Sequence, residues 1–282
     1  MEAEKRIINT RGGIWKHRLL NWIGSHEEFP ARLRLFGLIK KLFGLELLLF
    51  KTPSGLNLLL DISDWVQYQI YLFGSYEIES LTLFKKLAQN ASVVFDVGAH
   101  IGQYALECAH DDATQTKRIF AIEVNPKTFT YLLNNIQLNK LKNITPVLGA
   151  VAANSGILNI NIPAYWNMGN TQIAEIKDGQ GLNNYLVSSF SILDVLKLHG
   201  LTRIDLLKID VEGNELIVLN NLFTEGIYPA NIILEFIPDS FSQCADLLAL
   251  LQKSGYLLKD VIGNLYHEQT ELLEQNLWAQ RA

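Results

Sequence analysis

The sequence predicts an α/β fold, a doubly wound, Rossmann-like sheet that follows an N-terminal helical and hairpin extension. From about Glu79 onward, short apolar runs alternate with amphipathic helical segments, which is typical of a parallel sheet with right-handed crossovers. A glycine-containing turn follows the first of these runs, and acidic residues stand where three later runs end. Such sheets bind ligands at the carboxyl ends of their strands. The three observations together indicate a ligand-binding α/β domain.

The expected elements follow in a regular order. Apolar runs on either side of Thr52-Pro53-Ser54-Gly55 predict a β-hairpin. Strands are predicted at 92–97, 118–123, 144–148, 204–210, 232–236, 256–262 and 277–281. Asn125 followed by Pro126 is a typical helix start. We therefore divide the chain into a basic helical extension (1–45), a hairpin and lid segment (46–78) and a ligand-binding domain (79–282).

One segment, residues 154–190, interrupts the alternation of strands and helices. It contains four glycines, one proline and a strand-like run at 157–162. Insertions into sheets of this kind lie on the surface and often carry binding residues. We expect this segment to help shape the substrate site.

The composition excludes several classes of protein. Of 282 residues, 49% are hydrophobic and 19% are charged, which excludes disorder as the main state. Two cysteines provide neither a disulfide framework nor a zinc spacing, and no apolar run is long enough to span a bilayer, so we expect a cytoplasmic protein. The net charge of −5 argues against broad binding to a phosphate backbone, and we expect no nucleic-acid partner.

The first 45 residues differ in charge from the rest of the chain. They contain nine basic and four acidic residues, and their apolar residues recur at helical spacing. Two interpretations are open. The segment is a cap on the catalytic domain, which we prefer, or residues 11–45 contact an anionic membrane surface or a partner.

The most informative motif is a turn between a buried strand and a helix start, Asp96-Val97-Gly98-Ala99-His100-Ile101-Gly102. Gly98 lets a ligand approach the backbone, and free N–H groups at the helix start suit an anion. A dinucleotide site requires a Gly-x-Gly-x-x-Gly spacing, which this turn lacks, and Asp96 would repel a pyrophosphate. A ligand with both an ammonium and a carboxylate group, such as S-adenosylmethionine, suits Asp96 and the helix start together.

Glu123 ends the second predicted strand of the domain. An acid at this place can accept two hydrogen bonds from a ribose diol. Because NAD enzymes and S-adenosylmethionine enzymes share this feature, Glu123 does not distinguish between them. A solvent-exposed strand end is the alternative interpretation.

Two further strands end in acids. Asp210 follows Leu206-Leu207-Lys208-Ile209, and Glu235 follows Ile232-Ile233-Leu234. Carboxylates at neighbouring strand ends can remove a proton from a hydroxyl group or bind a divalent cation. We rank Asp210 first, Glu235 second and Glu212 third as catalytic candidates. Glu215 is expected to stabilise the start of the following helix.

Two of these motifs, together with Glu123, resemble the FkbM family of S-adenosylmethionine-dependent methyltransferases. They are the glycine turn and the run Lys208-Ile209-Asp210-Val211-Glu212-Gly213, and the segment Gly74-Ser75-Tyr76-Glu77 also resembles the part before the family's first helix. The resemblance covers about residues 56–260. It implies a seven-stranded methyltransferase sheet with an antiparallel last strand. The cofactor-binding residues it implies are Asp96, Gly98, Ala99, His100, Gly102, Glu123 and Ala150.

The resemblance also implies a reaction. It implies O-methylation of a hydroxyl on a sugar, a glycolipid or a secondary metabolite, so the expected partner is a small-molecule or glycan acceptor. The family usually has Asn where this chain has His100, and a histidine could make cofactor affinity depend on pH. The alternatives are an NAD-dependent oxidoreductase and an inactive module that binds the cofactor without turnover.

Overall fold

The computed structural model describes residues 47–162, 172–173, 184–211, 213–236, 244–267, 270 and 272–281. The chain divides into two compact units, one of residues 1–76 with 165–167 and one of residues 77–164 with 168–282. The predicted extension (1–45), with the segment 11–45 interpreted as a cap or as a membrane or partner contact, and Glu212 lie outside the described residues. Among the described helices, none has the length and apolar character needed to cross a membrane.

The described part of the first unit is a hairpin followed by a helix. Strands β1 (Leu47–Lys51) and β2 (Asn57–Asp61) pair in antiparallel register, which confirms the predicted hairpin. Helix α3 (Trp65–Phe73) begins after Asp64, whose carboxylate accepts a hydrogen bond from the N–H of Gln67. The helix was not predicted, because its nearly continuous apolar residues show no helical period.

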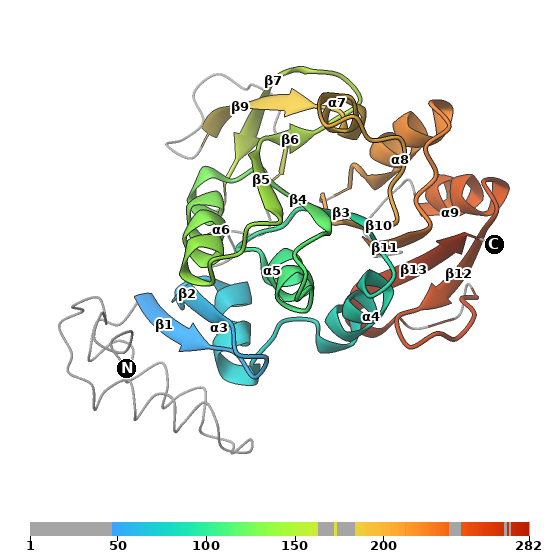
Figure 1. Ribbon diagram of the computed structural model, residues 1–282. Coiled ribbons are helices and arrows are strands. Elements are labelled where there is room, and N and C mark those ends of the chain that lie inside the picture. The colour runs from blue at the N-terminus through green and yellow to red at the C-terminus, as the bar shows by residue number, and fades with distance from the viewer. Residues whose placement is uncertain are drawn as a thin grey trace. The chain divides into compact units, whose positions relative to one another are not determined.

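The second unit is built on a seven-stranded sheet with the order β12-β13-β11-β10-β3-β4-β5 (Figure 1). Neighbours are parallel from β11 to β5, while β13 is antiparallel to both β11 and β12. The doubly wound sheet with an antiparallel last strand is therefore confirmed. The strands are β3 (Val93–Val97), β4 (Arg118–Glu123), β5 (Ile144–Leu148), β10 (Leu206–Ile209), β11 (Asn231–Glu235), β12 (Tyr256–Asp260) and β13 (Asn276–Arg281).

Helices pack on this sheet and bury its central strands. All five residues of β3 are buried, and the rings of Phe95 and Phe120 stack across the β3–β4 pair with centroids 4.6 Å apart. Strands covered on both faces are apolar throughout rather than alternating, which is why these runs could be recognised in the sequence. The helices are α4 (Ile78–Ala88), α5 (Gln103–His110), α6 (Pro126–Leu138), α7 (Ile192–Leu198), α8 (Glu215–Thr224) and α9 (Cys244–Lys253) (Figure 1).

The predicted insertion contributes a second, four-stranded sheet with the order β6-β9-β7-β8. Its strands are β6 (Ala150–Val151), β7 (Gly156–Asn161), β8 (Gln172–Ile173) and β9 (Asn184–Phe190). One face packs around Ala150, Ile160 and Val187. On the other face, Ile157 and Leu186 are 73% and 71% exposed. The insertion is therefore a sheet with one buried and one open face.

Candidate functional site

The glycine turn connects β3 to α5 and lies against the end of β10. Gly98 has a φ of +80°, and a Cβ atom there would lie 2.0 Å from the backbone oxygen of Asp210. The N–H groups of Gly98 and Ala99 both donate to the carbonyl of Ile122, at 3.0 and 2.9 Å. Only glycine satisfies this contact and this φ together, so the turn is fixed against the ends of two neighbouring strands.

Gly102 sets the start of helix α5. Its φ is +92°, and a Cβ atom would lie 2.3 Å from a methyl group of Leu106 and 2.4 Å from one of Leu132. His100, between the two glycines, has a φ of +52°. Histidine and asparagine are both enriched in this left-handed region, so the backbone explains how His100 stands where the resembled family usually has Asn.

Asp96 lies in the interior of β3 and is fully buried. Its Oδ2 accepts a hydrogen bond from the N–H of Ala105 at 3.1 Å, while its Oδ1 is buried without a hydrogen-bond partner among the described residues. Burial raises the pKa of Asp96 from its usual 3.8 to about 6, against the opposing effect of Lys208. A buried carboxylate oxygen without a partner is costly, and a cationic group of a ligand would satisfy it.

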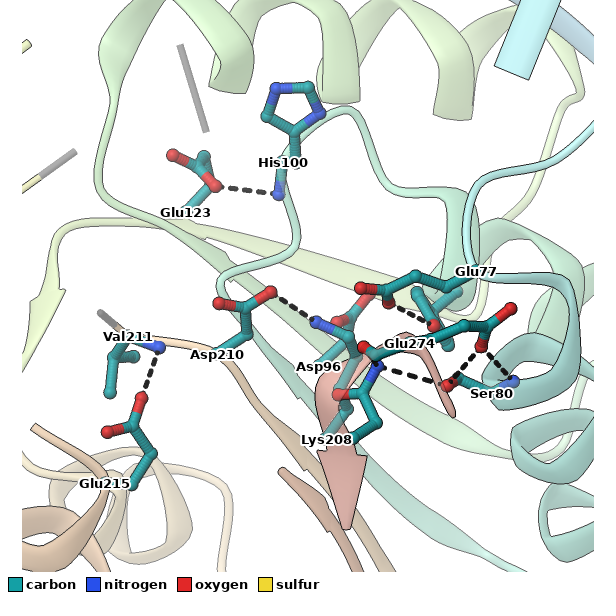
Figure 2. A network of polar contacts seen from close by, with 12 residues as sticks. Glu77, Ser80, Asp96, His100, Glu123, Lys208, Asp210, Val211, Glu215 and Glu274 are labelled. Atoms are coloured by element: carbon teal, nitrogen blue, oxygen red, sulfur yellow. Dashed lines mark hydrogen bonds and ion pairs between the residues drawn. The ribbon is translucent and has the colours of Figure 1, made fainter. Parts of the chain in front are cut away.

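Glu123, at the end of β4, is held by two backbone donors. Its Oε2 accepts from the N–H of His100 at 2.7 Å (Figure 2), and its Oε1 accepts from the N–H of Asn125, also at 2.7 Å. The side chain is buried, so the alternative of a solvent-exposed strand end is wrong. Each carboxylate oxygen keeps a second lone pair, which suits a vicinal diol.

Asp210 follows β10 and stands at the same edge of the sheet. Its N–H donates to the carbonyl of Val97 at 3.0 Å, and its Oδ2 lies 3.2 Å from the Nζ atom of Lys208 (Figure 2). The Asp210 side chain is 32% exposed and that of Lys208 only 5%. Asp210 is therefore a carboxylate that is open to a ligand on one side and paired with a buried ammonium group on the other.

Glu77 is a member of the site that the sequence did not identify. Its Oε2 accepts a hydrogen bond from the hydroxyl of Tyr104 at 2.8 Å, and the Nζ atom of Lys208 lies 4.9 Å from the centroid of the Tyr104 ring. Burial raises the pKa of Glu77 from its usual 4.5 to about 7, although Lys208 opposes this rise. The segment Gly74–Glu77 was recognised in the sequence as similar to the family, but nothing in it indicates that Glu77 lies near Tyr104 and Lys208.

A second missed residue, Glu274, holds the start of helix α4. Its two carboxylate oxygens accept from the N–H groups of Glu79 and Ser80, at 3.0 and 2.8 Å, and the Ser80 hydroxyl donates at 2.7 Å (Figure 2). These bonds satisfy donors that a helix N-terminus otherwise leaves unpaired. Glu274 thus fixes the helix that Glu77 precedes.

Three other residues were singled out from the sequence, namely Glu235, Glu215 and Ala150. Ile209 of β10 is paired with Leu234 of β11, so Glu235 stands next to Asp210 along the edge of the sheet. Glu215, the first residue of α8, accepts from the N–H of Val211 (Figure 2) and from that of Gly213, which is a structural role at the helix start. Ala150 begins β6, beside β9.

Among the described residues, no three His, Cys, Asp or Glu side chains form a group that could bind a metal ion.

Comparison with known proteins gives a family for this site. The family described as the methyltransferase FkbM domain matches residues 96–258, more than half of the chain. The tRNA (guanine(37)-N(1))-methyltransferase Trm5b of Pyrococcus abyssi is 30% identical over 115 residues, which are 40% of this chain and 32% of that protein. A tRNA(Phe) (4-demethylwyosine(37)-C(7)) aminocarboxypropyltransferase of Methanocaldococcus jannaschii is 30% identical over 110 residues, 39% of this chain and 41% of that protein.

Solved structures of methyltransferases also match this chain, at low sequence identity. The crystal structure of Trm5b from Pyrococcus abyssi has a TM-score of 0.43 and 17% identity, covering 83% of this chain and 54% of that one. An S-adenosylmethionine-dependent methyltransferase from Agrobacterium tumefaciens has a TM-score of 0.46 and 10% identity, covering 84% and 70%.

The curated relatives correct one expectation. Both relatives named above are tRNA-modifying enzymes, and this chain spans 32% and 41% of their lengths. The prediction that excluded a nucleic-acid partner is therefore wrong. It rested on the net charge of the whole chain, which averages over all surfaces, whereas recognition depends on the charge of one local surface.

Proposed function

Because this chain belongs to the FkbM family of methyltransferases, we propose that it transfers the methyl group of S-adenosylmethionine to a hydroxyl oxygen of its acceptor. The acceptor hydroxyl belongs to a sugar, a glycolipid or a secondary metabolite. The site has two parts in this proposal. The cofactor half consists of Asp96, the turn 98–102 and Glu123, and the acceptor half consists of Glu77, Lys208, Asp210 and Glu235.

The cofactor half fits the two polar ends of S-adenosylmethionine. The unpartnered Oδ1 of Asp96 suits the ammonium group, and Glu123 suits the ribose diol. The N–H groups of Gly98, Ala99, His100 and Gly102 already donate to the carbonyls of Ile122 and Ala99 and to Glu123, so these residues would shape the turn around the cofactor rather than donate to its carboxylate. The backbone N–H of Ala150 would meet the adenine. When bound, the cofactor supplies an electrophilic methyl group on a positively charged sulfur.

The acceptor half supplies a base. A hydroxyl group is a weak nucleophile and must lose its proton as its oxygen forms the new bond to carbon. In our proposal the proton goes to the Asp210 carboxylate, the carbon–sulfur bond breaks, and its electron pair stays on sulfur. Glu235 is the second candidate for the base and Glu212 the third. Because the leaving group is good, positioning of the acceptor contributes much of the rate.

The observation that carries this proposal is the position of Asp210. Its backbone oxygen lies against Gly98, and its partly exposed carboxylate stands at the same edge as Asp96 and Glu123. A base at this place is beside the cofactor turn without contributing to its hydrogen bonds. Binding of the cofactor and removal of the proton are therefore assigned to different side chains.

Two substitutions test this separation. We expect Asp96→Ala to weaken binding of S-adenosylhomocysteine at least tenfold, which corresponds to about 1.4 kcal/mol, as measured by calorimetry. We expect Asp210→Asn to bind it normally at neutral pH and to lose transfer of labelled methyl groups. Asp246→Asn, on the exposed surface of α9, is the matched control and changes neither quantity. Survival of transfer in Asp210→Asn would assign the base to another residue.

tRNA is a second candidate acceptor, favoured by the curated relatives. The transfer assay therefore includes unmodified tRNA beside hydroxyl-bearing glycans and lipids. Methylation of a tRNA base, with no product from any hydroxyl acceptor, would replace the O-methyltransferase proposal. Binding of S-adenosylhomocysteine without transfer to any acceptor would instead favour an inactive cofactor-binding module.

A further inference from the structure

Lys208 of the acceptor half is a buried lysine that also borders the cofactor half. Lys208 is 4% exposed and sits within β10, and its Nζ atom is 3.2 Å from Oδ2 of Asp210. The ring of Tyr104 covers the ammonium group at 4.9 Å from its centroid. Burying an ammonium group is costly unless nearby anions compensate it. The surroundings of Lys208 therefore indicate what its charge stabilises.

Lys208 faces the carboxylate of the cofactor half as well as that of the acceptor half. In the parallel β3–β10 pair, Lys208 is the register partner of Asp96. Register partners on adjacent strands direct their side chains to the same face of the sheet, with the backbones about 4.8 Å apart. Figure 2 shows Lys208 next to Asp96 and linked to Asp210. One positive charge is thus shared between two carboxylates with different proposed roles.

Lys208 and the other neighbours of Asp96 shift the pKa of Asp96 in different directions. Burial raises the pKa of Asp96 to about 6, while Lys208 and the Ala105 N–H lower it. Carboxylates nearby act in the other direction. The titratable groups that face Asp96 are Lys208 and Asp210 on β10, Glu123 on β4, and Tyr104 and Cys108 on α5.

Lys208 is itself held in its charged form by three carboxylates. Burial alone lowers the pKa of Lys208, but Asp210, Asp96 and Glu77 together raise it above its usual range. The ammonium group therefore stays charged over the whole range in which Asp96 titrates. A fixed positive charge beside a titrating carboxylate favours the ionised form of that carboxylate.

We propose that Lys208 is a positioning residue that keeps Asp96 ionised for the cationic end of the cofactor while it holds the Asp210 carboxylate in place. This inference rests on the proposed function, since it assigns Asp96 to the cofactor. It predicts that Lys208 acts on the pH dependence of cofactor binding. A residue that only fills space would change the affinity by the same factor at every pH.

The test is binding of S-adenosylhomocysteine by calorimetry from about pH 5 to about pH 8.5. The wild-type affinity falls as Asp96 takes up its proton, with a midpoint set by the pKa of about 6. Lys208→Met moves this midpoint to higher pH, so that binding is at least tenfold weaker at pH 6.5 and within about threefold of wild type at pH 8.5. Lys208→Arg keeps the charge and follows the wild-type profile.

A second variant tests the same charge balance without removing the lysine. Because Asp210 raises the pKa of Asp96, Asp210→Asn moves the midpoint to lower pH, opposite to Lys208→Met. If circular dichroism shows that Lys208→Met does not fold, Lys208→Gln takes its place in the same titration. An unshifted midpoint in the folded uncharged variant, a uniform loss of affinity in that variant and in Lys208→Arg, or a shift of the same sign in that variant and in Asp210→Asn would overturn the proposal. Wild type that binds no S-adenosylhomocysteine at any pH would refute the proposed function instead.

Discussion

The cofactor half and the acceptor half of the site hold their carboxylates in different ways. Asp96 and Glu123 accept hydrogen bonds from backbone N–H groups, at 3.1 Å for the first and 2.7 Å for the second. Asp210 and Glu77 are instead held by the side chains of Lys208 and Tyr104. Backbone donors are fixed by the fold whatever the side chains are. The cofactor half therefore depends on backbone geometry, and the acceptor half depends on a small set of side chains that support one another.

The largest expected effect comes from breaking the backbone geometry of the cofactor half. In Gly98→Ala, the added Cβ would lie 2.0 Å from the Asp210 carbonyl oxygen at a φ of +80°, so the turn must move. We expect S-adenosylhomocysteine to bind at least about a hundredfold more weakly, a loss of about 2.7 kcal/mol or more by calorimetry.

The control for this prediction is another glycine with a positive φ. Gly200 has a φ of +62°, and a Cβ atom added there would have no neighbour within 4 Å, so Gly200→Ala introduces backbone strain without a clash. Its cost is confined to a stability loss of about 1 kcal/mol, with unchanged binding. Equal binding by Gly98→Ala and wild type would contradict the claim that the backbone fixes the cofactor half.

A smaller effect is expected when a carboxylate of the cofactor half is changed and its backbone donors stay. Glu123→Gln keeps one acceptor oxygen but directs an NH2 group toward one of the two N–H donors and loses the charge. One charged hydrogen bond to the ribose contributes about 1.5–3 kcal/mol of binding free energy, so its loss weakens binding by roughly tenfold to a hundredfold. Glu225→Gln, at the exposed end of α8, leaves the affinity unchanged. An unaltered dissociation constant for Glu123→Gln would remove Glu123 from the cofactor site.

The smallest effect concerns the stability of the acceptor half. The pKa of Glu77 is raised to about 7, so its ionised form destabilises the folded protein. The stability that protonated Glu77 contributes is complete below its usual pKa of 4.5 and is lost as the pH rises through about 7. Glu77→Gln keeps an acceptor for the Tyr104 hydroxyl without the charge. We therefore expect its melting temperature at pH 8 to exceed that of wild type by a few degrees, on the order of 1–2 kcal/mol.

Two comparisons check this prediction. At pH 5 the wild-type Glu77 carries its proton, so the difference from Glu77→Gln should disappear. Glu79→Gln, an exposed substitution in the first turn of α4, should give no increase at either pH. A lower melting temperature for Glu77→Gln at pH 8 would show that ionised Glu77 stabilises the acceptor half.

The contrast between carboxylates held by backbone donors and carboxylates held by side chains also explains which parts of the fold and the site could be predicted from the sequence. The family and the seven-stranded sheet are confirmed, and strands β4 and β5 have the predicted bounds. Buried parallel strands are apolar runs, and the turn after β3 carries its glycines within a few residues, so both signals are local. The structure brings Asp96, Gly98 and Glu123 to one edge of the sheet, and their assignment to the cofactor stays a prediction.

What the sequence did not predict depends on distant contacts. Glu77 accepts a hydrogen bond from Tyr104, and the Tyr104 ring lies over Lys208, so these three residues from distant parts of the chain come together by folding, which no spacing in the sequence encodes. Helices α3 and α7 were also missed, although Ser191 and Asp194 form a capping box at the start of α7. Strand β9 was not predicted, because its pairing with β7 is what makes it a strand.

The contact between Gly98 and the Asp210 carbonyl also limits how this enzyme could evolve. The turn and the strand end touch without room for a methyl group, so a substitution in one requires a compensating change in the other. New acceptor preferences then have to arise at positions outside that contact. Strands β6, β7, β8 and β9 of the second sheet do not take part in this contact, so substitutions in them can alter the surface of that sheet without moving the turn.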